Sequence, residues 1–188
     1  QNKNIAANEA SAAGNQDKTI SIYKKLIAAG KGNFEAYQNY LAYLAETAEN
    51  DGSNGAYLKE FNAYFNTNLG DKGNVIERLD QMFGSLGTDS EYGFNGWNWF
   101  KEYHSNLCNS AAWTVVSKPG NTDFLKSAIG WSEYSLAVTK NNPYYLDTLA
   151  QLYYKDGQKE KAIATQTAAV IYIYKSIPDS PNHVSLHV

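Results

Sequence analysis

The sequence has very few of the residues that build covalent or metal-bound scaffolds. Among 188 residues it has one cysteine, Cys108, and three histidines. A single cysteine excludes an intramolecular disulfide, a CxxC redox motif and a zinc site built on cysteines. We therefore expect a protein that works without a metal ion or another cofactor.

Strong charge of one sign and long apolar stretches are missing as well. The net charge is −3 and the isoelectric point is about 5.6. Such a chain has no strongly basic surface to neutralise phosphates, which argues against a nucleic-acid partner. Its longest unbroken apolar run is only a few residues, far short of a bilayer span. We expect a protein that is not membrane-spanning.

What the sequence does contain is helical spacing, because period-2 alternation is almost absent. Hydrophobic residues make up 43% of the chain, enough for a sizeable core. Short turns rich in Gly, Asn and Asp separate the periodic segments, which predicts an all-α fold whose sequential helices pack antiparallel. About nine helices are expected, over residues 3–13, 17–29, 34–48, 54–67, 73–86, 95–117, 122–139, 143–155 and 159–175.

The last two predicted helices carry a recognisable pattern of large and small residues. The first has Leu146-x-x-Leu149-Ala150-x-x-Tyr153, and the second opens with Ala162-Ile163 and has Ala169 seven residues after Ala162. The pattern recurs upstream as Cys108-x-x-Ala111-Ala112-x-x-Val115 at an offset of 38 and as Ala128-Ile129 at an offset of 34. It resembles a tetratricopeptide repeat, which implies an antiparallel helix-pair array, an α-solenoid. A helical bundle without repeats is the alternative.

Residues 100–175 have a narrower resemblance. The segments Asn106-Leu107-Cys108-Asn109-Ser110-Ala111-Ala112-Trp113 and Tyr145-Leu146-Asp147-Thr148-Leu149-Ala150 look like parts of the helical segment that follows the thioredoxin-like domain in some exported bacterial thioredoxin-family proteins. That resemblance implies a location in the bacterial envelope and an accessory, non-catalytic role. The chain departs from such proteins because it has neither a CxxC motif nor a βαβ pattern.

One pair of residues suggests catalysis. His104 and Cys108 lie four apart on a predicted helix and therefore share a face, where an imidazole could activate a thiol. Cys108, however, occupies a core position of the repeat, equivalent to Leu146, and a buried cysteine behaves as a small hydrophobe. We expect no enzyme activity from this pair.

Two groups of residues are candidates for binding. In a helix-pair array the first helices line a concave face, which suits an extended peptide. The pattern places these side chains on it: Asn109, Trp113, Tyr144, Asp147, Gln151, Tyr154 and Lys155. The second group is a possible aromatic loop in the glycine-rich segment 84–100, with Tyr92, Trp97 and Trp99. The alternative is that its aromatics cap the core.

These observations predict a single helical domain over residues 1–175 and a non-helical C-terminal arm over 176–188, where two prolines prevent a helix. We expect a non-catalytic scaffold that binds a partner protein or peptide, exported to the periplasm or associated with the outer membrane. One alternative is an accessory helical domain, or fragment, of an exported thioredoxin-family redox protein. A weaker one is a carbohydrate-binding component that uses the aromatic loop.

Overall fold

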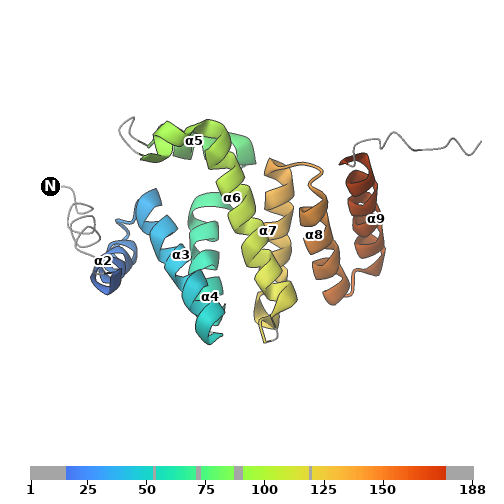
Figure 1. Ribbon diagram of the computed structural model, residues 1–188, viewed down its shortest axis with the longest axis horizontal. Helices are drawn as coiled ribbons and strands as arrows, with labels where there is room; N and C mark the ends of the chain where they lie inside the picture. The colour runs from blue at the N-terminus through green and yellow to red at the C-terminus, as the bar shows by residue number, and fades with distance from the viewer. Residues whose placement is uncertain (1–15, 53, 71–72, 87–90, 119, 177–188) are drawn as a thin grey trace, which may run out of the picture. The chain divides into compact units, whose positions relative to one another are not determined.

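The computed structural model describes residues 16–52, 54–70, 73–86, 91–118 and 120–176, and every regular element in these ranges is helical (Figure 1). This confirms the all-α prediction. The eight α-helices of the described residues, with a π-helical turn after α4 and a 3-10 turn before α7, are α2 (Gln16–Ala28), α3 (Phe34–Asp51), α4 (Asn54–Tyr64), α5 (Val75–Gly84), α6 (Glu91–Ser117), α7 (Leu125–Val138), α8 (Pro143–Lys155) and α9 (Lys159–Ser176).

Several helices begin and end near the predicted turns, although α6 starts at Glu91, four residues before the expected position. Asn33, Asn74 and Asn142 cap the first turns of α3, α5 and α8, and each side-chain oxygen accepts a hydrogen bond from a backbone N–H that the helix leaves unpaired. Gly52 ends α3 with a φ of 75°, which a side chain would disfavour. The expected helix at 3–13 and nearly all of the arm at 176–188 lie outside the described residues.

The chain divides into two compact units, residues 1–68 and 69–188. In the first unit α3 packs against both α2 and α4. Its core includes Tyr23, Ala36 and Tyr40, with Ile20 and Leu44 packed against them. The single domain over 1–175 stays a prediction, and we describe each unit by itself.

In the second unit each helix packs against the next one along the chain from α5 to α9. Helix α6 also packs against α8, so the α6–α7 pair is covered by the helix that follows it. Small buried residues, among them Ala111, Ala112 and Ala128, let these helices approach closely, and Trp131 and Leu152 fill the space between. In Figure 1 helices α6 to α9 stand in a row that ends at α9. The solenoid arrangement remains a prediction.

Hydrogen bonds between helices add to this packing. The buried Ser105 Oγ on α6 donates to the Ser135 carbonyl oxygen on α7, at 2.8 Å. The Tyr153 hydroxyl on α8 donates to the Glu133 carboxylate on α7, at 2.7 Å. None of the helices in the described ranges is both long enough and apolar enough to cross a lipid bilayer.

Candidate functional site

Helix α8 presents most of the predicted binding residues. It starts at Pro143, and the Asn142 side-chain oxygen accepts hydrogen bonds from the backbone N–H groups of Tyr144 and Tyr145, at 3.0 and 3.3 Å. Leu149, Ala150 and Tyr153 are buried as the repeat pattern predicts. Tyr144 and Tyr154, 75% and 69% exposed, point out at opposite ends of the helix.

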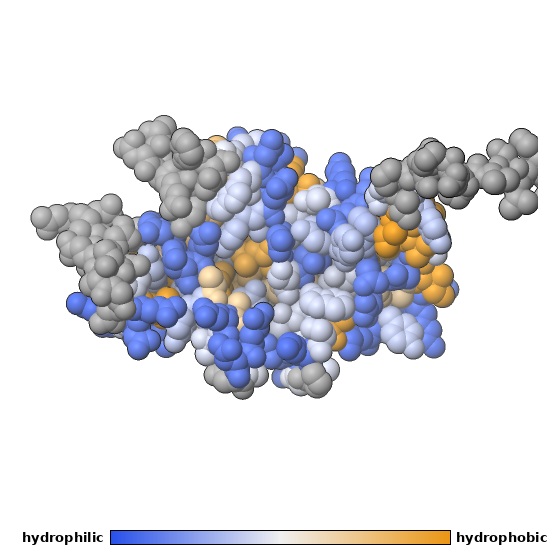
Figure 2. Space-filling view, in the orientation of Figure 1, coloured by the Kyte–Doolittle hydropathy of each residue, from blue (hydrophilic) through white to orange (hydrophobic). Residues whose placement is uncertain are grey.

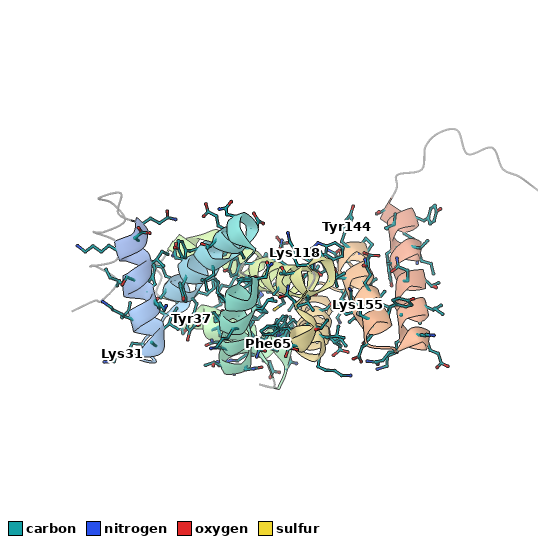
Figure 3. The ribbon with its side chains drawn as sticks, turned by 90° about the horizontal axis from the view of Figure 1, so that it is seen from below. Lys31, Tyr37, Phe65, Lys118, Tyr144 and Lys155 are labelled. Atoms are coloured by element: carbon teal, nitrogen blue, oxygen red, sulfur yellow. The ribbon has the colours of Figure 1, made fainter. Side chains whose placement is uncertain are left out.

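Helices α8 and α9 together line an open cavity of about 520 Å³. Three predicted binding residues line it, namely Gln151, Tyr154 and Lys155. Figure 3 labels Lys155 at the end of α8. The other lining residues are Ala150 on α8 and Ala162, Ile163 and Gln166 on α9. The structure therefore brings three predicted residues together, in a cavity with a small-residue floor and an exposed aromatic side chain at its edge.

Asp147 holds the two helices of this site together. Its carboxylate accepts a hydrogen bond from Gln151 Nε2 on its own helix, at 2.7 Å, and one from Gln166 Nε2 on α9, at 3.0 Å. A half-buried carboxylate with two amide donors is already satisfied, so Asp147 positions its neighbours. The sequence reasoning missed Gln166, whose position in the repeat pattern normally carries an aromatic side chain.

The remaining predicted residues of the concave face lie on α6. Trp113 is exposed, whereas Asn109 is half-buried and its Oδ1 atom accepts no hydrogen bond from the described residues. Lys155 also lines a second cavity, of about 340 Å³, together with Val115 and Lys118 at the end of α6. Lys155 thus lies between two cavities, and no contact places Tyr144, Asn109 or Trp113 in either of them.

Equivalent positions of the two helix pairs differ in burial. The offset of 34 residues matches Ile129 on α7 with Ile163 on α9. Ile129 is 8% exposed in the pair that α8 covers, and Ile163 is 69% exposed. In the α6–α7 pair the equivalent surface is covered by α8. In the α8–α9 pair this surface is open, and the cavity lies on it. The sequence offset was the signal that could have identified Ile163 as a site residue.

The aromatic segment is helical at Trp97 and Trp99, as the helix expected over residues 95–117 predicts, and does not form the possible aromatic loop there. Gly96, with a φ of 83°, interrupts α6, and both Trp97 and Trp99 follow it on the helix. Trp97 contacts Phe83 and Phe100, with ring centroids 5.7 and 6.4 Å away. These contacts fit the alternative in which the aromatics cap the core. Trp99 stacks on Tyr103, and the Tyr92 side chain lies outside the described side chains.

His104 and Cys108 are both fully buried on α6. Burial raises the pKa of the Cys108 thiol well above its usual value, so the thiol does not form the nucleophilic thiolate near neutral pH. Burial also lowers the pKa of His104 to about 4, and its Nδ1 atom lies 2.9 Å from the Phe100 carbonyl oxygen. Burial thus favours the neutral form of both side chains, as is expected in a protein core.

Two other features bear on chemistry. The described residues hold no cluster of three or more His, Cys, Asp or Glu side chains that could bind a metal ion. The first unit has a cavity of about 320 Å³, lined by Thr19, Tyr23 and Glu46 among others, without a predicted site residue. The α8–α9 cavity is therefore the better candidate.

Comparison with known proteins yields no relative: no protein-family model, no curated protein and no solved structure matches the chain.

Proposed function

We propose that this chain is a non-catalytic interaction module and that a partner protein docks on the open surface of the α8–α9 pair. The observation that carries the proposal is the contrast between Ile129 and Ile163, equivalent residues of which the second is left open to solvent. An open repeat surface of this kind can bury a segment of another protein in the way that the chain buries its own helices.

The chemistry of the cavity supports a protein ligand. Its floor is apolar, and Tyr154 and Ile163 rise beside it as large exposed side chains. Tyrosine is enriched among the residues that dominate binding energy in interfaces, because it offers a large rigid ring and a polar hydroxyl. Lys155 adds a positive charge at the rim, which favours a partner segment with an acidic residue there.

The proposed site includes part of the predicted concave face and is centred on the α8–α9 cavity. Gln151, Tyr154 and Lys155 belong to the cavity, and Trp113 on α6 provides a further exposed aromatic ring in the same unit. Export to the bacterial envelope and an accessory role beside a thioredoxin-like domain remain part of the proposal. They rest on the sequence resemblance alone.

A pull-down with matched tyrosine variants tests the proposal. The chain is immobilised, exposed to a bacterial envelope extract, and compared with Tyr154→Ala and Tyr144→Ala. Both tyrosines are exposed on α8, but Tyr154 alone of the two lines the cavity. We expect Tyr154→Ala to weaken capture of a protein other than this chain about 30-fold, which corresponds to roughly 2 kcal/mol.

Tyr144→Ala should retain capture, and circular dichroism melts should show both variants folded. Equal capture by Tyr154→Ala and the unchanged chain would place the binding site elsewhere. Loss with Tyr144→Ala alone would move it to the other end of α8.

A further inference from the structure

Helix α9 exposes more large apolar side chains than any other described helix. Figure 2 shows hydrophobic surface gathered over it. One side of α9 packs on α8, with Ala162 and Ala169 buried. Elsewhere on the helix large apolar side chains are 41–72% exposed, namely Ile163, Val170, Ile171, Ile173 and Tyr174. A contiguous exposed apolar patch on a soluble surface commonly marks an interface.

Three of these exposed residues form a stripe. Ile163, Val170 and Tyr174 have the spacing i, i+7 and i+11, and a rotation of 100° per residue places them within a narrow sector of the helix. At 1.5 Å per residue the stripe is about 16 Å long, or three helical turns. It is therefore long enough to pack against another helix along most of α9.

This stripe is complementary to itself. When two α9 helices lie antiparallel, Ile163 of one faces Tyr174 of the other, and the two Val170 side chains lie near the middle of the contact. The two helix dipoles then oppose each other, which is favourable. A two-fold interface requires this property, because the same surface serves both partners.

The charges agree with the same arrangement. Glu160 lies in the first turn of α9 and Lys175 in the last. Helical rotation places both on one side of the stripe, so an antiparallel pair brings each Glu160 near the Lys175 of the other copy. In the single chain the Lys175 ammonium lies 5.5 Å from the Tyr172 ring centroid, and its flexible side chain has to rotate to reach Glu160.

From these observations we infer that the α8–α9 surface binds a second copy of this chain, with the two α9 helices antiparallel across a two-fold axis. The inference goes beyond the proposed function, because a second copy would occupy the same surface and compete with the partner protein proposed above. Each copy covers the open helix pair of the other, including the exposed Ile163 beside the cavity.

Sedimentation equilibrium on the full chain tests the inference. We expect the average mass to rise from 20.9 kDa toward twice that value as concentration increases to about 0.5 mM, where even a contact with a Kd of about 0.1 mM is largely formed. Ile163→Glu should shift the Kd at least about 30-fold, since it buries an unpaired carboxylate. The matched control is Ile76→Glu, an exposed isoleucine on α5 that should leave the Kd unchanged.

A charge exchange tests the antiparallel register. Glu160→Lys and Lys175→Glu should each weaken the dimer, because like charges then meet, and the double variant should restore it. Circular dichroism melts verify that every variant is folded.

A chain that stays monomeric at 0.5 mM overturns the inference, as does a dimer that Ile163→Glu leaves intact or a double variant that fails to restore binding. These results leave the proposed function to its own test, because the tyrosine variants measure capture of a different protein.

Discussion

His104 should make the stability of the protein fall in mild acid. Burial lowers the pKa of this imidazole from 6.5 to about 4 in the folded chain. Between these values the unfolded chain binds a proton that the folded chain excludes, so the free energy of unfolding decreases as the pH falls. The difference of about 2.5 pKa units corresponds to about 3 kcal/mol once the pH is below 4, and to about 2 kcal/mol at pH 5.

Urea unfolding monitored by circular dichroism at several pH values between 7 and 4 measures this loss. The His104→Asn variant removes the titrating group, while its amide nitrogen can still donate to the Phe100 carbonyl oxygen. The variant starts from a lower stability, but its stability should change about 3 kcal/mol less than that of the unchanged chain over the same pH range. The matched control replaces His183 and His187 with glutamine and should retain the full dependence.

The reasoning is refuted when His104→Asn and the unchanged chain lose stability in parallel between pH 7 and 4. It is also refuted when the loss disappears in the control that lacks His183 and His187. In either case the imidazole would have to titrate in the folded chain at its ordinary pKa, which requires access to water that the fully buried ring does not have.

Three further predictions concern packing. Thiol reagents should label Cys108 slowly in the native state and rapidly in urea, because the side chain is fully buried; fast native labelling would contradict this burial. Leu149→Ala should lower the free energy of unfolding by about 2–5 kcal/mol in urea titrations through a core cavity, and an unchanged midpoint would mean that α8 presents another face. Ala169→Leu should lower the free energy of unfolding by about 1–3 kcal/mol through overpacking. Ala162→Leu should lower it less, because Ala162 lines the open cavity. Equal melting temperatures of the two variants would contradict this difference.

Helix boundaries and the buried face of α8 could be predicted from sequence because local chemistry determines them. Asn142 and Pro143 start α8 through a side-chain cap and a preset φ, and Gly157, with a φ of 80°, follows its end. Leu149 and Ala150 are buried because helical spacing puts them on a face that packs against neighbouring helices. The signals for these features lie within a few residues of the features themselves.

The candidate site was predicted less well, because it depends on which helices become neighbours. Asp147 has the spacing of a groove residue, but Gln166 on α9 reaches it and converts it into a link between helices. Trp97 stands in a glycine-rich segment typical of a loop, yet Phe83 on α5 provides a ring for it to pack against. Neither partner is close in sequence, so spacing along the chain could not identify these contacts.

Ile129 and Ile163 show that local sequence patterns alone do not determine burial. Ile129 and Ile163 have the same residue type and equivalent positions in the pattern, and propensity and periodicity treat them alike. Their burial differs because α8 packs against α7 in the first case, and no described helix takes the corresponding place beside α9 in the second. The burial of a residue in a row of helices therefore depends on the helix that follows as much as on the residue itself. Ile163, which the fold leaves open, is for this reason central to the partner surface that we propose.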